Sequence, residues 1–247
     1  MRSVLMATPG LGPHFQLELA REGRMDRMIV HVAAAEGPVG SDALTAAGPK
    51  GWAIPRGLAR DHDAKRAALR RGAAAHFASQ GYDRASMASV AAACGVSKAL
   101  IYHYYDGKEA LLFDLLHEHL SSLARVIETV GQTGTAEARL RDTIRAILLE
   151  YEDADDAHKV QLETLDTLPP ERRDPLIRLM RGMVARLGER LEAAAPAGLR
   201  ERRRAVTMSV FGMLNCYYTW NRPGRGMDRT AYADMVTDLV LGGNRSL

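Results

Sequence analysis

The stretch of sequence that decides the fold is residues 86–111, which read SMASVAAACGVSKALIYHYYDGKEAL. Ser86 is a favourable N-cap for a first short helix, and Gly95 can adopt the left-handed conformation that ends it. Ser97 can then cap a second helix that extends to Tyr105. A short helix, a tight turn and a second short helix together predict a helix-turn-helix.

The second helix carries more hydrogen-bonding side chains than packing alone requires. Leu100 and Ile101 can face the protein, while the polar and aromatic side chains of the same helix remain outside. Such side chains suit contacts with phosphates and base edges in a DNA groove. A helical hairpin inside an ordinary all-helical protein is the alternative, but it does not require Ser-Lys before Tyr-His-Tyr-Tyr.

Residues 64–113 resemble the DNA-binding domain of the TetR/AcrR family of bacterial transcriptional regulators. The run GVSKALIYHYYDGKEAL, residues 95–111, is close to the family pattern at nearly every position. Three residues depart from that pattern. Ser89 stands where an acid is usual, which weakens the capping box of the first short helix, His76 replaces a leucine and Gly72 replaces an alanine. We expect these departures to lower local stability and to remove no DNA contact.

The resemblance implies sequence-specific binding to double-stranded DNA, with the second helix as the reading element. We expect Lys98 and Tyr102 to approach bases or adjacent phosphates, and the remaining residues to contact chiefly the DNA backbone. The full set of expected DNA-contacting residues is Ser86, Ser97, Lys98, Ala99, Tyr102, His103, Tyr104 and Lys108.

Composition limits the kinds of partner. The 247 residues carry a net charge of +3, so the whole molecule is not a general binder of polyanions. The charge is unevenly placed, because between Arg60 and Ala110 eight basic residues exceed five acidic ones by three. A basic surface beside a recognition helix is typical of a DNA-binding domain.

Other function classes find little support in the sequence. Cys94 and Cys216 do not form a CxxC pair, so we interpret both as small core residues in a reducing compartment. We expect no catalytic, metal or cofactor site, because enzyme motifs are missing and the acidic residues 152–156 lack the spacing of a calcium loop. A membrane span and a secretory leader are not indicated, and the cytoplasm is the expected location. A helical enzyme and an adaptor that binds protein remain as alternatives.

The chain divides into three expected parts. Residues 1–60 are punctuated by glycine and proline, and we expect a disordered N-terminal extension, with a downstream start or a DNA-binding arm as alternatives. Residues 61–113 form the helix-turn-helix domain, and residues 114–247 form an effector-binding and dimerisation domain. The fold is expected to be all-α, with a long fourth helix from Gly107 to about Val130 joining the two domains.

The resemblance also implies a homodimer that binds an inverted repeat. In the family, the last two helices of each subunit form a four-helix interface, and here these helices have wide apolar faces. The expected interface residues are Val206, Val210, Leu214, Tyr217, Tyr218, Tyr232, Met235, Val236 and Leu239. Intramolecular packing must use part of each face.

We expect the second domain to bind a small hydrophobic effector that relieves repression, with the long fourth helix as the lever. The C-terminal helices resemble those of regulators that respond to acyl-CoA thioesters, so such a thioester is one candidate. An efflux-type regulator that senses hydrophobic drugs is the alternative. The expected ligand-binding residues are Tyr151, Met180, Phe211, Trp220 and Arg178.

Overall fold

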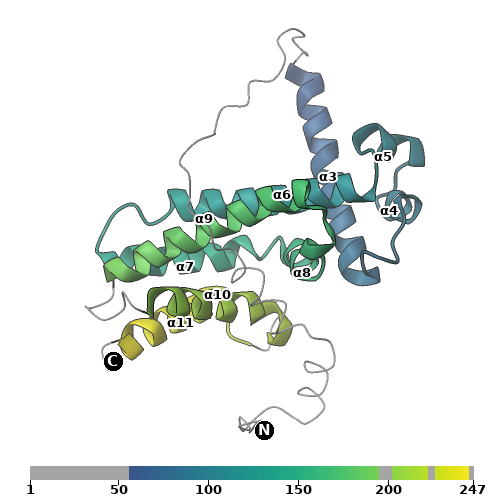
Figure 1. The fold of residues 1–247 in the computed structure, drawn as a ribbon. Helices are drawn as coiled ribbons and strands as arrows, with labels where there is room; N and C mark the ends of the chain where they lie inside the picture. Colours follow the sequence, from purple (N-terminus) through teal and green to yellow (C-terminus); the bar gives the residue numbers. More distant parts are fainter. Residues whose placement is uncertain (1–55, 195–201, 222–225, 245–247) are drawn as a thin grey trace, which may run out of the picture.

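The structure, a computed structural model, describes residues 56–194, 202–221 and 226–244, and within these ranges every regular element is a helix (Figure 1). The predicted all-α fold is therefore confirmed. Along the chain the elements are α3 (Arg56–Gln80), α4 (Met87–Ala93), α5 (Lys98–Tyr104), α6 (Lys108–Thr129), α7 (Ala136–Glu150), α8 (Asp155–Thr164), the short 3-10 helix η1 (Leu165–Thr167), α9 (Pro170–Ala194), α10 (Arg203–Trp220) and α11 (Arg229–Asn244).

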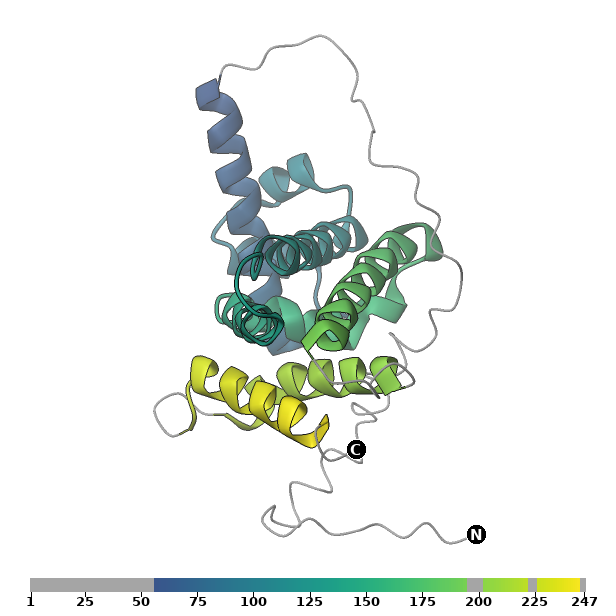
Figure 2. The same ribbon diagram turned by 90° about the vertical axis from the view of Figure 1, so that its left-hand side faces the viewer.

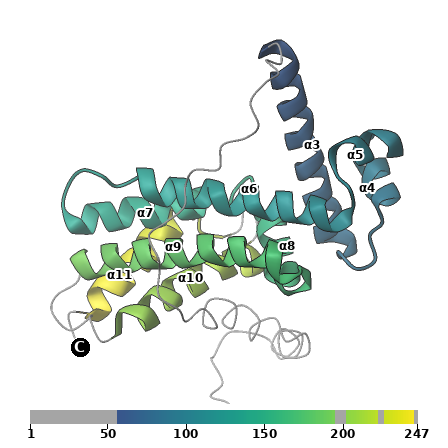
Figure 3. The same ribbon diagram turned by 45° about the horizontal axis from the view of Figure 1, so that its top comes forward.

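The helices form a small head and a larger body. Helices α3, α4 and α5 make the head at one end of α6, as Figure 1 shows. In the body, α9 packs against both α6 and α7, and α11 packs against α7. Figures 2 and 3 show α10 and α11 lying side by side as a further layer on the body. Helix α8 lies between the body and the head, because it packs on α3 as well as on α6.

The helices form where the sequence repeats apolar residues at helical spacing. The predicted stripe of the first helix, Leu69, Ala73 and Phe77, is confirmed, since all three side chains are buried. Helix α6 buries apolar residues along its whole length, from Leu111 to Ile127. Because α6 is buried at both ends, it can fix the orientation of the head relative to the body.

The expected domain boundaries fall inside helices. Helix α3 begins at Arg56, so its first five residues belong to the segment 1–60 that was expected to be disordered, and residues 1–55 lie outside the described residues. The boundary after residue 113 falls within α6, which continues unbroken from the head into the body. Among the described residues, no helix is long and apolar enough to cross a membrane.

Candidate nucleic-acid interface and effector cavity

The first short helix of the helix-turn-helix has a complete capping box. Ser86 is the N-cap of α4, and its hydroxyl accepts a hydrogen bond from the Ser89 backbone N–H at 3.1 Å. The Ser89 hydroxyl in turn accepts from the Ser86 backbone N–H at 3.0 Å. The expectation that serine at this position weakens the cap is therefore wrong, because its hydroxyl takes the place of the usual carboxylate. His76 also contacts this hydroxyl, with 3.0 Å between its Nε2 and Ser89 Oγ.

The turn and the second helix form as the sequence predicts. Gly95 has a φ of 66°, the left-handed conformation that ends α4. Ser97 caps α5, and its hydroxyl accepts a hydrogen bond from the Leu100 backbone N–H at 3.1 Å. Ile101 is fully buried and fixes α5 against the head. The opposite side of α5 remains free to meet another molecule.

Most of the expected DNA-contacting residues share this outer surface. Ser86, Ser97, Lys98, Ala99, Tyr102 and His103 are all exposed. Tyr102 is 46% exposed, and the Lys98 ammonium lies 5.8 Å from the centroid of its ring. Tyr104 is half-buried, with its ring 4.7 Å from that of His62 on α3.

Lys108, which was expected to contact a DNA phosphate, binds backbone carbonyls of its own chain instead. Its ammonium donates hydrogen bonds to three backbone carbonyls, those of Tyr82, Asp83 and Ala85, at 2.9–3.3 Å. It also lies 4.3 Å from the centroid of the Tyr82 ring. An ammonium has three N–H donors, so a DNA phosphate would have to displace one of these carbonyls. The side chain closes the loop between α3 and α4 onto the start of α6.

Asp114 gathers several basic and polar side chains at the junction of the head with α6. Its carboxylate accepts hydrogen bonds from Arg66 at 2.6 and 3.0 Å and from Arg70 at 3.3 Å. The Tyr105 hydroxyl donates to the same group at 2.8 Å, and burial of this tyrosine raises its pKa. Two of the basic residues counted in the sequence, Arg66 and Arg70, are therefore paired with a carboxylate of the same chain. The remaining exposed positive charge near α5 is correspondingly smaller than the sequence count suggests.

A mostly apolar cavity of about 320 Å³ lies between α6, α8, α9 and α10. Three of the expected ligand-binding residues, Tyr151, Met180 and Phe211, line this cavity together. Trp220 and Arg178, the other two expected ligand-binding residues, do not line it. Trp220 is 42% exposed at the end of α10, and Arg178 points to solvent on α9.

Two buried histidines and a glutamine lie on one side of this cavity, and none of the three was expected from the sequence to bind a ligand. His158 and Gln161 line it from α8, and His119 stands behind them on α6, with its ring 5.7 Å from that of His158. Burial lowers the pKa of His119 to about 4 and that of His158 to about 3. The imidazoles are therefore neutral at physiological pH. Their spacing along the sequence gave no signal, because they come together only through the packing of α8 on α6.

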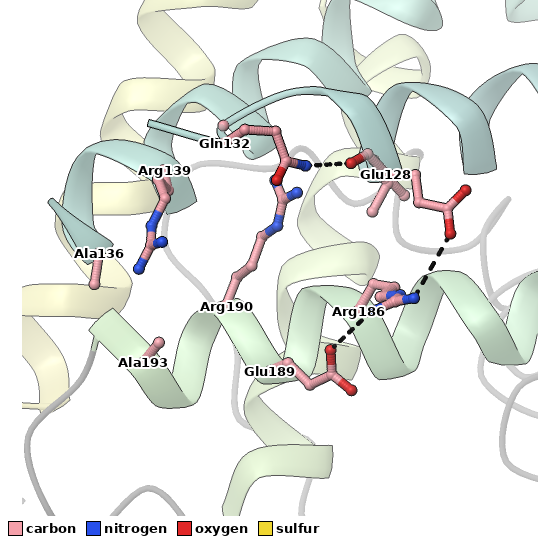
Figure 4. A pocket seen from close by; sticks show the side chains of 10 residues that line it. Glu128, Gln132, Ala136, Arg139, Arg186, Glu189, Arg190 and Ala193 are labelled. Carbon is pink, nitrogen blue, oxygen red and sulfur yellow. Dashed lines mark hydrogen bonds and ion pairs between the residues drawn. The ribbon is translucent and has the colours of Figure 1, made fainter. Parts of the chain in front are cut away.

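A second cavity, of about 410 Å³, lies at the far end of the body, where α6, α7 and α9 meet (Figure 4). Its wall is strongly charged. Arg186 pairs with Glu128 at 3.6 Å and with Glu189 at 3.5 Å, and Arg139 and Arg190 complete the basic side. Burial lowers the pKa of Arg190, and the two neighbouring arginines lower it further. Such a lining does not suit a hydrophobic effector, so the apolar cavity is the better candidate.

The acidic residues 152–156 lead into α8, with Asp155 and Asp156 in its first turn. Asp155 opens α8, and its carboxylate accepts a hydrogen bond of 2.6 Å from Arg229 on α11. The described residues contain no group of three or more side chains that could hold a metal ion.

The expected dimer surface is largely core within one chain. Five of its nine residues are buried in the protomer, because α10 and α11 pack first on α9 and α7: Val210, Leu214, Tyr217, Tyr232 and Val236. The expectation that these five lie in the interface is therefore corrected. Val206 and Tyr218 are half-buried, whereas Met235 is 42% and Leu239 is 61% exposed. The exposed apolar surface of these helices is narrower than the sequence pattern indicated.

Comparison with known proteins extends over nearly all of the described residues. Residues 69–115 match the family described as bacterial regulatory proteins, tetR family, and residues 133–244 match the tetracyclin repressor-like C-terminal domain. A TetR-family transcriptional regulator from Bordetella parapertussis is 34% identical in sequence, with a TM-score of 0.66 over 74% of this chain and 96% of that one.

Two further relatives are similar in sequence. AibR, whose structure contains isovaleryl coenzyme A and operator DNA, is 26% identical, with a TM-score of 0.63 over 71% of this chain and 97% of its own. A helix-turn-helix transcriptional repressor from Mycobacterium tuberculosis is 33% identical over 90 residues, which are 36% of this chain. That match spans 46% of the repressor's length, about half.

Proposed function

This chain belongs to the TetR family of bacterial regulatory proteins, and on that basis we propose that it is a transcriptional repressor that binds an operator and is released by an effector. The observation that carries the proposal is α5. The helix is capped at Ser97, fixed in the head by Ile101 and otherwise presents polar and aromatic side chains to solvent. This arrangement supports its insertion into a major groove.

The proposed DNA surface consists of the exposed residues of the helix-turn-helix. Lys98 and Tyr102 would contact bases or neighbouring phosphates, and Ser86, Ser97 and His103 would contact chiefly the backbone. Lys108 would act mainly by fixing the loop that precedes α4, since its ammonium already has three carbonyl acceptors.

We further propose that two copies bind an inverted repeat. One helix-turn-helix reads only a half-site, and two recognition helices held at a fixed separation give useful specificity. The exposed apolar side chains of α11, Met235 and Leu239, support an interface between copies at this layer.

The proposed effector is a small hydrophobic molecule that occupies the cavity lined by Tyr151, Met180 and Phe211. An acyl-CoA thioester is one candidate, and it is supported by the isovaleryl coenzyme A bound to AibR. The alternative is a hydrophobic drug sensed by an efflux-type regulator. Titration of an operator complex with acyl-CoAs, free fatty acids and planar drugs would separate these two.

A gel-shift and footprinting experiment on the DNA upstream of the gene tests the DNA-binding function. Replacement of Tyr102 by alanine should cost roughly 1–3 kcal/mol of specific binding, because the side chain lies on the exposed face of α5. The matched control is Tyr105→Phe, which removes the buried hydrogen bond to Asp114 but no surface group. This control should lower the free energy of unfolding and leave operator selectivity unchanged.

Two outcomes would contradict the proposal. A folded Tyr102→Ala protein that protects the operator as well as the wild type would remove α5 from the reading role. A wild-type protein without affinity for duplex DNA at moderate salt would favour the adaptor alternative instead.

A further inference from the structure

The wall of the apolar cavity contains polar atoms that the protein itself does not satisfy. His158 and Gln161, one turn apart on α8, are 1% and 5% exposed. Neither ring nitrogen of His158 nor Oε1 of Gln161 has a hydrogen-bond partner among the described residues. The Gln161 amide nitrogen has the thioether sulfur of Met180, 3.9 Å away, as a weak acceptor. Buried polar groups are almost always paired, so a cavity wall that holds several unpaired ones indicates a polar partner.

The His158 ring is held in place by its neighbours. It stacks on Tyr151 with 4.2 Å between the ring centroids and an angle of 24° between the planes. The edge of Tyr218 lies against it, with centroids 5.9 Å apart. A ring fixed in this way loses little freedom when it binds a ligand, which favours recognition.

The cavity offers no charge to an ionic ligand. Among the described residues, none of those that line it is an aspartate, glutamate, lysine or arginine. Burial lowers the pKa of His158 to about 3, and His119 and the Arg229 guanidinium act in the same direction, while polar contacts with the Gln161 side chain and the Asn215 backbone oppose it only in part. The imidazole is therefore neutral, with one nitrogen as a donor and the other as an acceptor.

Resting on the proposed function, we propose that the effector is a neutral apolar alcohol or phenol whose hydroxyl group is bound by His158 and Gln161. A hydroxyl group both donates and accepts, so it can accept from the imidazole N–H and donate to the Gln161 carbonyl. A carboxylate would be buried without a free cation, because Arg229 near His158 is already paired with Asp155, and such burial is costly.

The rest of the cavity fits a compact hydrocarbon body. Leucine, valine, phenylalanine and methionine account for seven of the thirteen lining residues, and methionines such as Met183 and Met208 adapt to the shape of a ligand. A volume of about 320 Å³ is at the lower end of the range for small-molecule sites. The phosphates of a coenzyme A thioester would have to remain outside it.

Calorimetry with four probes tests the proposal: 1-naphthol, naphthalene, 1-naphthoate and isovaleryl coenzyme A. Wild-type protein should bind naphthol roughly tenfold more tightly than naphthalene, since the hydroxyl group adds a paired buried hydrogen bond. Naphthoate and the thioester should bind more weakly than naphthol.

Two variants locate the preference on α8. In His158→Phe the aromatic stack with Tyr151 can persist, but both ring nitrogens are lost, so naphthol and naphthalene should bind about equally. The melting temperature of the ligand-free variant should change little, because neither ring nitrogen of His158 makes a hydrogen bond of good geometry within the protein. Gln161→Leu provides a second variant with the same expected loss, and His117→Phe, on the exposed side of α6, should leave the tenfold preference intact.

Several results would overturn the proposal. These are naphthoate or the thioester binding more tightly than naphthol, a preference that survives in His158→Phe and in Gln161→Leu, and no binding by any probe. A permanently bound water that satisfies the imidazole would give naphthol no advantage over naphthalene. Failure of the proposed function is separable, because a protein that prefers naphthol but never shifts operator DNA would retain the ligand chemistry and lose the repressor role.

Discussion

Two unusual residues of the head are explained by their neighbours. A Cβ placed on Gly72 would lie 2.5 Å from Cys94 Sγ, so the glycine makes room for the cysteine where α3 meets α4. In the same way His76 meets the Ser89 hydroxyl that completes the cap of α4. His76 thus contacts Ser89, and Gly72 accommodates Cys94, so these departures from the family pattern need not lower local stability as the sequence suggested.

The packing of Gly72 on Cys94 gives a test by double-mutant cycle. Gly72→Ala should lower the free energy of unfolding by about 1–3 kcal/mol, because the new methyl group overlaps the sulfur. In Cys94→Ala that overlap is absent, so adding Gly72→Ala there should cost much less. Urea unfolding of the four proteins provides the comparison, and equal costs in both backgrounds would show that the two residues are independent.

The buried histidines predict how stability depends on pH. Burial holds the pKa of His119 and of His158 well below 6.5, so the unfolded chain binds more protons than the folded one as the pH falls. Their contribution is fully present above about pH 6.5. Below it, the free energy of unfolding should fall by roughly 1 kcal/mol per pH unit for each histidine. Arg229 near His158 adds to the effect, and Tyr151 stays neutral.

Urea unfolding between pH 7.5 and 5.0, at one protein concentration, measures this slope. His158→Phe should flatten it, since one of the two titrating groups is removed. An unchanged slope in this variant would mean that other groups govern the acid sensitivity.

At the scale of elements, α8 links the cavity directly to the reading head. His158 and Gln161 face the cavity, while Lys159 between them donates a 2.7 Å hydrogen bond to the carbonyl of Ala78 in the last turn of α3. A ligand that shifts α8 would therefore act directly on the end of α3. Helix α6, the lever expected from the sequence, also joins the head to the body.

Lys159→Met tests the role of α8 in transmission. It removes the bond to α3 but keeps the aliphatic chain, so effector binding should persist while the effector weakens operator binding less than in the wild type. The coupling free energy, about 1–3 kcal/mol in typical allosteric proteins, should decrease. Lys159→Arg retains a donor and serves as the control. Full coupling in Lys159→Met, from operator titrations with and without effector, would assign the transmission to α6.

At the scale of the whole molecule, burial distinguishes residues that build one chain from residues that can join two. Leu239 is 61% exposed on α11, whereas Val236, one turn earlier, is fully buried. Both belong to the apolar face read from the sequence. The same helix can therefore supply the core of the protomer and a surface for a second copy.

Leu239→Glu should give a folded monomer with weaker operator binding, because a charge would stand in an apolar contact between copies. Val236→Glu should instead unfold the chain, since it buries an unpaired charge in the core. Leu149→Glu, at a 45% exposed position of α7, is the matched control and should remain dimeric. Sedimentation gives the mass and circular dichroism the helix content. An unchanged dimer in Leu239→Glu would move the interface elsewhere.

Local sequence determined the helix-turn-helix and the start of α6. Serine caps, the glycine at residue 95 and apolar repeats act over a few residues, so Ser86, Ser97 and α6 could be predicted without knowledge of the fold. The exposed side chains of α5 were predictable for the same reason, because Lys98 and Tyr102 stand one turn apart and remain outside while Ile101 is buried.

Tertiary structure decided which of several equivalent side chains are buried and which groups meet. Val210 and Leu239 both lie on apolar faces in the sequence, and only packing on α9 and α7 separates core from surface. The meeting of His158 with His119, and of Lys108 with three carbonyls, depends on chain segments that are distant in sequence. The periodicity of apolar residues shows which face of a helix is apolar. Whether a residue on that face is buried depends on the elements packed against it, and these are fixed only when the helices pack together.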